Sequence, residues 1–97
     1  MRFEIVLAPE AVDDMKGLGA NLRAEVRAAI ATHLRHEPKK VSRSRIKRLS
    51  GISRPQFRLR AGEVRVFYDV SGSVVEILAI IAKPEAARWL AQFGNPA

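Results

Sequence analysis

The sequence contains no cysteine, so disulfide bonds, thiolate catalysis and cysteine-based zinc sites are excluded. Long apolar segments are also missing. The apolar run from Ile77 to Ala82 is far shorter than the roughly 20 residues that span a bilayer. Residues 1–5 lack the long apolar core of a signal peptide. We therefore expect a cytoplasmic protein that does not enter a membrane.

Metal ligands and catalytic bases are scarce. His33 and His36 are the only histidines, and no acidic cluster accompanies them, so we expect a structural or surface role for both. The acidic pair Asp13–Asp14 is expected on the solvated face of a helix. No serine has a histidine base near it in the sequence, and no glycine-rich phosphate loop follows a strand. The sequence therefore predicts neither a metal site nor a cofactor.

Acidic residues are absent from one segment of an otherwise balanced chain. The formal net charge is +7, and residues 39–60 account for all of the excess, because they hold nine basic groups and no acidic one. A block of one sign repels itself, which predicts an anionic partner, either a nucleic acid or an acidic protein. The basic groups of this segment are Lys39, Lys40, Arg43, Arg45, Lys47, Arg48, Arg54, Arg58 and Arg60.

The first half of the chain shows one strand pattern and two helix patterns. Residues 2–7 alternate as a strand, and Pro9 favours the start of a helix that ends near Gly17. A second helix is expected over residues 20–36, with apolar side chains at four-residue steps. The two helices and their short glycine-containing loop form an αα-hairpin. The apolar positions of the second helix are Leu22, Val26, Ile30 and Leu34.

The second half has strand periodicity. Pro38 disfavours a helical conformation at the residue before it. Residues 39–48 are expected to be a loop, with a short strand near residues 45–49. Strands are predicted over residues 56–60, 63–70 and 74–82, and the last of them is apolar enough to be buried on both faces. Lys83 to Glu85 opens a short C-terminal helix. Residues 1–97 are thus expected to form one α+β domain: an N-terminal strand, an αα-hairpin, an antiparallel β-meander with about four strands in all, and a C-terminal helix. We expect the helices to cover one face of the sheet.

Strand alternation locates the candidate site. Phe57 and Leu59 belong to the core, so Arg58 and Arg60 must project from the opposite face. Arg65 of the next strand is expected to join them in an exposed platform, because guanidinium groups bind phosphate in a bidentate fork and stack on bases. Phe67 lies on the same side and either packs or stacks on a base. We expect four catalytic residues, Arg58, Arg65, Lys47 and Lys83, and four RNA-binding residues, Arg45, Arg48, Arg60 and Arg54.

Three segments carry a family resemblance: residues 49–51 (Leu-Ser-Gly), residues 57–68 (Phe-Arg-Leu-Arg-Ala-Gly-Glu-Val-Arg-Val-Phe-Tyr) and residues 81–83 (Ile-Ala-Lys). Together with the predicted element order they resemble the RelE/ParE toxin superfamily. The resemblance implies a RelE-like fold and a toxin that an acidic antitoxin neutralises in a hetero-oligomer. RelE-like members of the superfamily cut mRNA on the ribosome without a metal, whereas ParE-like members inhibit DNA gyrase.

The resemblance also assigns roles to single residues. Arg58 matches a lysine position of the RelE-like active site, and Arg65 matches an arginine that clamps phosphate. Lys83 lies at the edge of a basic stretch, but Pro84 stands where arginine is expected, and Leu90 stands at the position of the C-terminal aromatic base. A ribosome-dependent endoribonuclease is the favoured function. A gyrase inhibitor and a non-catalytic RNA-binding or ribosome-binding protein remain as alternatives.

Overall fold

The computed structural model describes the whole chain, from Met1 to Ala97. Strand β1 (Glu4–Leu7) is followed by helices α1 (Pro9–Lys16) and α2 (Ala20–Leu34). Pro9 occupies the first turn of α1, where no intrahelical partner is lost for its missing N–H. The predicted αα-hairpin is confirmed. None of the helices has the length and apolar composition that a membrane-spanning segment requires.

The main sheet has five strands in the order β1-β6-β5-β4-β2. Its other members are β2 (Ile46–Arg48), β4 (Phe57–Ala61), β5 (Val64–Ser71) and β6 (Val74–Ala82). The predicted antiparallel meander is confirmed for β4, β5 and β6. Strand β1 instead pairs parallel with β6, so the N-terminal strand lies at one edge of the sheet and the central strand is β5.

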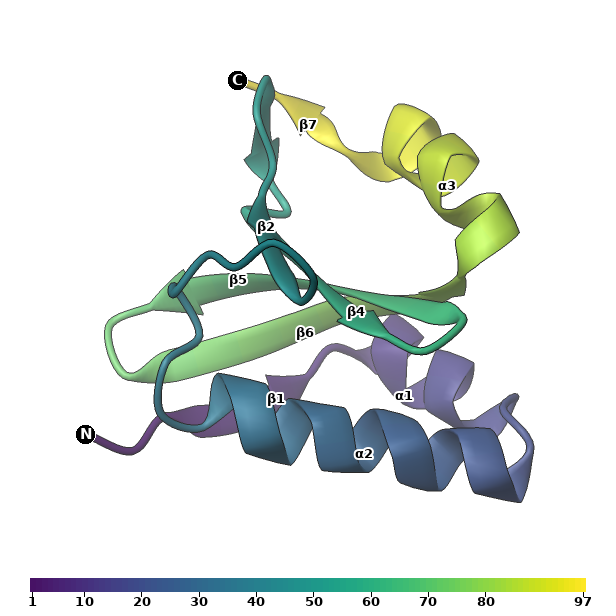
Figure 1. The fold of residues 1–97 in the computed structure, drawn as a ribbon. Helices are drawn as coiled ribbons and strands as arrows, with labels where there is room; N and C mark the ends of the chain where they lie inside the picture. Colours follow the sequence, from purple (N-terminus) through teal and green to yellow (C-terminus); the bar gives the residue numbers. More distant parts are fainter.

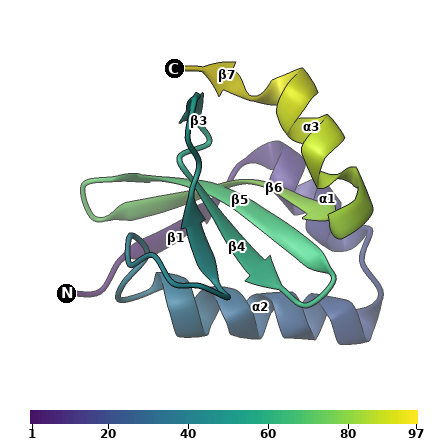
Figure 2. The ribbon, with the colours of Figure 1, turned by 45° about the horizontal axis from the view of Figure 1, so that its top comes forward.

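A second, two-stranded sheet raises the strand number above the four that we expected. It joins β3 (Ile52–Arg54) to β7 (Asn95–Pro96), which follows helix α3 (Ala86–Phe93). Helices α1 and α2 cover one face of the main sheet, whereas α3 lies on the other (Figures 1 and 2). The prediction that all helices share one face was therefore wrong for α3. Strands β5 and β6 carry buried apolar side chains on both faces of the sheet. Phe67 and Ala79, for example, lie on the face that α3 covers. Helices must therefore pack on both faces.

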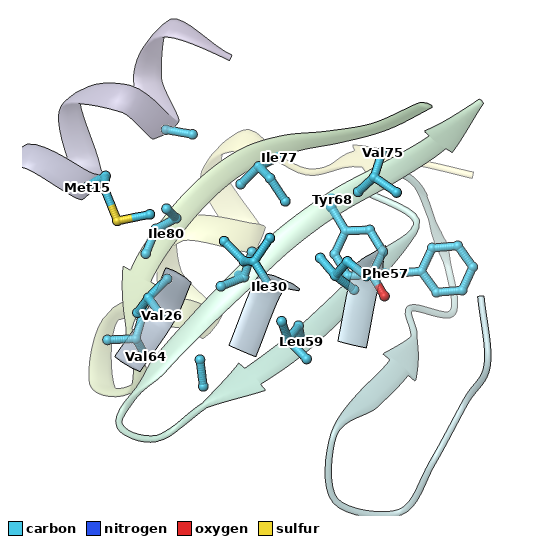
Figure 3. Packing of buried hydrophobic residues seen from close by; sticks show 14 of the residues in the cluster. Met15, Val26, Ile30, Phe57, Leu59, Val64, Tyr68, Val75, Ile77 and Ile80 are labelled. Atoms are coloured by element: carbon cyan, nitrogen blue, oxygen red, sulfur yellow. The ribbon is translucent and has the colours of Figure 1, made fainter. Parts of the chain in front are cut away.

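The main core lies between the sheet and helices α1 and α2 (Figure 3). Val26, Ile30 and Leu34 of α2 are buried, as their spacing predicted. On the sheet, Leu59 of β4 is fully buried in this core. Phe57 of the same strand stacks on Tyr68, with ring centroids 5.4 Å apart. The prediction that the odd-numbered side chains of β4 face the helices is thus confirmed.

Asp14 has a structural role that the sequence did not reveal. Strand β1 ends opposite Ile77, so the following residues of β6 have no strand on that side. The backbone N–H of Ile80 donates there to Asp14 Oδ2 at 2.9 Å. The expectation that Asp14 is only a solvated surface group was wrong, because its carboxylate satisfies a backbone donor that would otherwise lack a partner.

Tyr68 fastens the start of the basic segment to the sheet. Its hydroxyl donates to the carbonyl of Pro38 at 2.6 Å, and both residues are buried. Burial also raises the pKa of Tyr68 above its ordinary value of 10.0. This bond fixes the point from which the loop over residues 39–45 returns to β2.

We expect Tyr68→Phe to lower the free energy of unfolding by about 1–2 kcal/mol, because the Pro38 carbonyl stays buried without its donor. Its pH dependence supplies a second signature. Because the pKa of Tyr68 is raised in the folded state, the wild-type contribution is complete below pH 10 and is lost as the pH rises further. Urea titrations at neutral pH and above pH 10 measure both effects. A variant as stable as wild type at neutral pH would contradict the role of this bond.

Candidate nucleic-acid interface

The register of three strands gathers basic side chains on the sheet face that α1 and α2 leave free. Lys47 of β2 pairs with Arg58 of β4, and Arg58 pairs with Phe67 of β5. Two residues further along β4, Arg60 pairs with Arg65, and the N–H of Arg60 donates to the carbonyl of Arg45. Because alternate residues share a face, the side chains that lie in these strands form one set, and Arg45, in the bend just before β2, joins them through the bond of its carbonyl to Arg60. We call it the cationic face: Arg45, Lys47, Arg58, Arg60 and Arg65.

The cationic face has no counter-charge of its own. None of its five members makes a salt bridge. Arg58 is only partly exposed, and its buried Nε has no hydrogen-bond partner. Burial, together with the charges of Arg65 and Arg60, lowers the pKa of Arg58. A guanidinium held in this way is destabilised by its surroundings, and an anion that contacts it relieves both the missing bond and the repulsion.

Arg65 differs from its expected state. It was predicted to be an exposed member of the platform, but its relative exposure is only 8%. Strand β5 lies inside the sheet, so Arg65 sits between Arg60 on one side and Ile81 on the other. Its Nη1 donates to the carbonyls of Gly62 at 2.9 Å and Val64 at 3.1 Å. Arg65 therefore holds the β4–β5 turn as well as contributing charge.

Because of this contact, Arg65→Ala is expected to affect the stability of the fold as well as the site. We expect the free energy of unfolding to fall by about 1–3 kcal/mol, because a charge-assisted hydrogen bond to the turn is lost. Thermal unfolding of the variant measures the change. A melting temperature equal to that of wild type would mean that the turn does not depend on Arg65, and any loss of activity would then report on the site alone.

Phe67 is fully buried, and its ring stacks on Trp89 of α3 with centroids 4.9 Å apart. Trp89 also meets Phe93 at 5.8 Å. The Phe67–Trp89 stack attaches α3 to the sheet beside Arg58, the cross-strand partner of Phe67. In this structure Phe67 is thus a packing residue and is not free to stack on a base. Helix α3 lies on the side of the sheet opposite to α1 and α2 (Figure 2), which is also the side of the cationic face.

Three predicted site residues lie outside the cationic face. Arg48 is on the other side of β2, where its guanidinium lies 5.1 Å from the centre of the Phe57 ring. Lys83 follows β6, and its N–H donates to the Glu63 carbonyl at the β4–β5 turn. Its exposed side chain therefore starts beside the β4–β5 turn, which Arg65 also contacts.

Arg54 is the third. It pairs with Asp69 at 3.2 Å and with Glu76 at 3.3 Å. The other oxygen of Asp69 accepts the N–H of Gln56 at 2.7 Å. Arg54 thus neutralises the carboxylates of Asp69 in β5 and Glu76 in β6, a role that depends on where β3 of the small sheet lies against the main sheet and has no signal in the sequence. The structure holds no group of three or more metal-ligating side chains.

Solved structures of low sequence identity share this fold. Archaeal RelE, from the RelE–RelB complex of Pyrococcus horikoshii OT3, superposes with a TM-score of 0.69 at 21% identity, over 86% of this chain and 97% of that one. The chain has the RelE fold. A mutant of the E. coli toxin RelE in the free state gives a TM-score of 0.69 at 19% identity, over 94% and 93% of the two chains. YoeB from Staphylococcus aureus gives 0.59 at 17% identity, over 84% and 97%.

No protein-family model and no curated protein sequence matches the chain. The sequence predicted the RelE fold from three short segments and the element order, and the structure confirms this fold. Within this fold the cationic face occupies β2, β4 and β5, which are the strands that bring the basic segment and Arg65 together.

Proposed function

We propose that this chain is the toxin of a type II toxin–antitoxin system and that it cleaves mRNA on the ribosome without a metal. The observation that supports this most directly is the cationic face, five basic side chains without an ion pair on a rigid sheet. Guanidinium groups suit a phosphodiester, because their planar fork donates two parallel hydrogen bonds to phosphate oxygens. The cytoplasm is the compartment in which such a protein meets translating ribosomes.

The proposed reaction is a transesterification. The 2′-hydroxyl of the RNA attacks the adjacent phosphorus, the bond from phosphorus to the 5′-oxygen breaks, and a 2′,3′-cyclic phosphate forms. Negative charge grows on the phosphate oxygens in the transition state. Arg58 is placed to stabilise that charge, because it is fixed in the sheet and needs no reorganisation. Arg60 and Arg45, both exposed, are proposed to hold the neighbouring phosphates.

Proton transfer needs a donor and an acceptor. Lys47 is the proposed donor, because it pairs with Arg58 across the strands and its ammonium group can protonate the leaving 5′-oxygen. Asp69 is an unsuitable acceptor, because both of its oxygens are engaged, one by Gln56 and the other by Arg54. We therefore propose that the attacking hydroxyl gives its proton to water, which predicts a slow enzyme.

Lys47→Ala is expected to lower the cleavage rate by a factor of about 10² or more, because general acid catalysis typically contributes 10²–10⁴. Lys39→Ala is the matched control, since it removes the same exposed charge from the same basic segment. Its effect is expected to stay within a few-fold. Cleavage of a ribosome-bound message by the purified variants, followed by primer extension, measures both rates. Equal losses would instead support a diffuse electrostatic patch.

The partner that we propose is an acidic antitoxin, which would cover the chain in a hetero-oligomer. The P. horikoshii neighbour was solved as a complex of RelE with RelB, and the net charge of +7 favours an acidic partner here. A small acidic reading frame beside this gene would supply the protein for a direct binding test.

Induced expression in a bacterial host, with primer extension on a translated message, tests the proposed activity. Growth arrest with new 5′ ends inside codons would support the endoribonuclease. Growth arrest with intact messages and filamented cells would favour the gyrase inhibitor. No arrest at all would overturn the toxin and leave a basic protein that binds RNA or ribosomes.

A further inference from the structure

A pocket of about 440 Å³ lies on the sheet face that α1 and α2 leave free, at the end of β5 away from Arg65. This volume is within the range that small-ligand sites occupy. Val6 of β1 and Val74 of β6 give the pocket apolar surface. Strand β3 stands over this face of the sheet (Figure 2) and contributes Arg54. The polar side chains of the lining include Arg54, Gln56, Asp69 and Glu76.

The pocket adjoins the cationic face through β4. Gln56 comes just before β4, and Arg58 follows two residues later, so their side chains share a face and start about 7 Å apart. The N–H of Gln56 also donates to Asp69 Oδ1 at 2.7 Å, which keeps the end of β5 beside it. A nucleotide whose phosphate contacts Arg58 therefore has its base within reach of the pocket.

The amide of Gln56 is held in one orientation. Its Oε1 accepts the backbone N–H of Val70 at 2.9 Å, so its Nε2 is the atom that remains for a ligand. No hydrogen bond within the protein uses the two protons of Nε2. Gln56 therefore presents a hydrogen-bond donor, and not an acceptor, to a molecule in the pocket.

Glu76 supplies the acceptor. Its Oε1 accepts from Nη2 of Arg54 at 3.3 Å, whereas its Oε2 has no partner in the protein. The side chain of Glu76 is 40% exposed. Asp69 is only 14% exposed, and both of its oxygens are engaged. Glu76 is therefore the carboxylate that a ligand can reach.

Arg54 offers a flat surface at the same place. Its guanidinium is held by Asp69 at 3.2 Å and by Glu76 at 3.3 Å, yet half of the side chain is exposed. The hydrogen bonds of a guanidinium lie close to its plane, so its flat faces stay free. Nucleobases stack on such faces. The pocket thus combines a stacking surface, an apolar wall, one amide donor and one carboxylate acceptor.

We propose that this pocket binds a guanine base of the RNA, an inference that rests on the proposed function. The Watson–Crick edge of guanine carries the acceptor O6 beside two donors, N1–H and the N2 amino group. The Nε2 of Gln56 matches O6, and the carboxylate of Glu76 matches the two donors. Adenine, cytosine and uracil each carry an acceptor where guanine has one of these donors. Such an acceptor would face the Glu76 carboxylate and leave it without a partner.

The test uses the full-length protein and 2′-O-methyl hexanucleotides, which lack the attacking hydroxyl and therefore stay intact. One fluorescein-labelled probe holds six uracils, and the other has guanine in place of the third. Fluorescence anisotropy measures the two dissociation constants. Wild type is expected to bind the guanine probe about tenfold more tightly, because a well-matched bidentate contact discriminates between bases by a factor of this order. Equal dissociation constants would overturn the proposal.

Glu76→Gln is expected to reduce this preference to about twofold or less, because its new amino group meets the donors of guanine. Glu4→Gln is the matched control. Glu4 is an exposed carboxylate on the neighbouring strand β1, and it does not line the pocket. The two substitutions remove the same charge, so equal effects on the preference would overturn the proposal and indicate a general electrostatic influence.

Gln56→Glu tests the pocket independently of the Arg54 ion pairs. It keeps an oxygen for the N–H of Val70 and replaces only the amide donor. We expect the preference for guanine to fall at least about fivefold, since O6 then meets a carboxylate. A preference that persists in both Gln56→Glu and Glu76→Gln would place the base elsewhere and overturn the proposal.

The pocket and the proposed cleavage fail separately, because the probes need neither a ribosome nor a reaction. Guanine-selective binding by a protein that does not cleave messages would support the pocket and remove the endoribonuclease. Cleavage of messages by a protein with equal affinity for the two probes would support the endoribonuclease and remove the pocket. If both hold, the new 5′ ends are expected at a constant distance from a guanine in wild type and not in Glu76→Gln.

Discussion

Arg58→Met is expected to stabilise the protein and, at the same time, to lower mRNA cleavage by a factor of about 10²–10³, the usual cost of losing one preorganised group that stabilises transition-state charge. The stabilisation follows from the surroundings of Arg58. Burial and the charges of Arg65 and Arg60 lower its pKa, so the folded state disfavours the charged form at every pH at which arginine holds its proton. Methionine keeps an unbranched stem and removes the charge, for an expected gain of about 0.5–1 kcal/mol.

Thermal unfolding and ribosome-dependent cleavage measure the two halves of this expectation. A gain of 1 kcal/mol corresponds to roughly 4–8 °C in the melting temperature of a domain of this size. Arg43→Met is the control, because Arg43 is an exposed member of the same basic segment but is not part of the cationic face. It is expected to change both quantities little. If Arg58→Met cleaved as fast as wild type, Arg58 would have no part in the chemistry.

Leu59→Ala is expected to lower the free energy of unfolding by about 2–4 kcal/mol. Leu59 is fully buried in the core beneath α2, and its truncation leaves a cavity that the surrounding side chains fill only in part. Small domains have only about 5–15 kcal/mol of net stability, so this one substitution removes a large share of it. Chemical denaturation with the slope held common to both proteins measures the loss.

The neighbouring residue supplies the comparison for Leu59. Arg60 is exposed on the opposite side of the same strand, so Arg60→Ala is expected to change stability by about 0.5 kcal/mol or less. If Arg60→Ala proved as destabilising as Leu59→Ala, the assignment of the two faces of β4 would be wrong. The pair of variants thus tests the orientation on which the cationic face depends.

Several elements of the fold were predictable because their causes are local. Pro9 marks a helix start through backbone geometry that no distant contact alters. Pro38 predicted the end of the second helix near residue 36, and α2 ends slightly earlier, at Leu34. Strand β6 was predicted with its observed bounds, because a long apolar run suits a strand buried on both faces. The position of α3 was not predictable in the same way. The side of the sheet that it covers depends on where Phe67 lies, and therefore on the pairing of three strands.

The candidate site shows the same division. Alternation along β4 separates Arg58 from Leu59, and the sequence alone predicted it. The state of Arg65 was mistaken, because its burial arises from a place inside the sheet and from carbonyls of a turn. Arg54 was expected to bind RNA, yet it is occupied by two acidic partners that lie 15 and 22 residues away. Parity along a strand does not report such contacts.

The sequence by itself determined the helices, the strands of the main sheet, the basic segment and the two faces of β4, because periodicity, proline geometry and charge act over a few residues. Only the tertiary structure decided which charges stand together and which are neutralised. It paired Lys47 with Arg58, turned Arg54 toward Asp69 and Glu76, and formed the pocket beside them. These outcomes depend on strand order and register. Such features are fixed by the packing of the whole core, and no short segment encodes them.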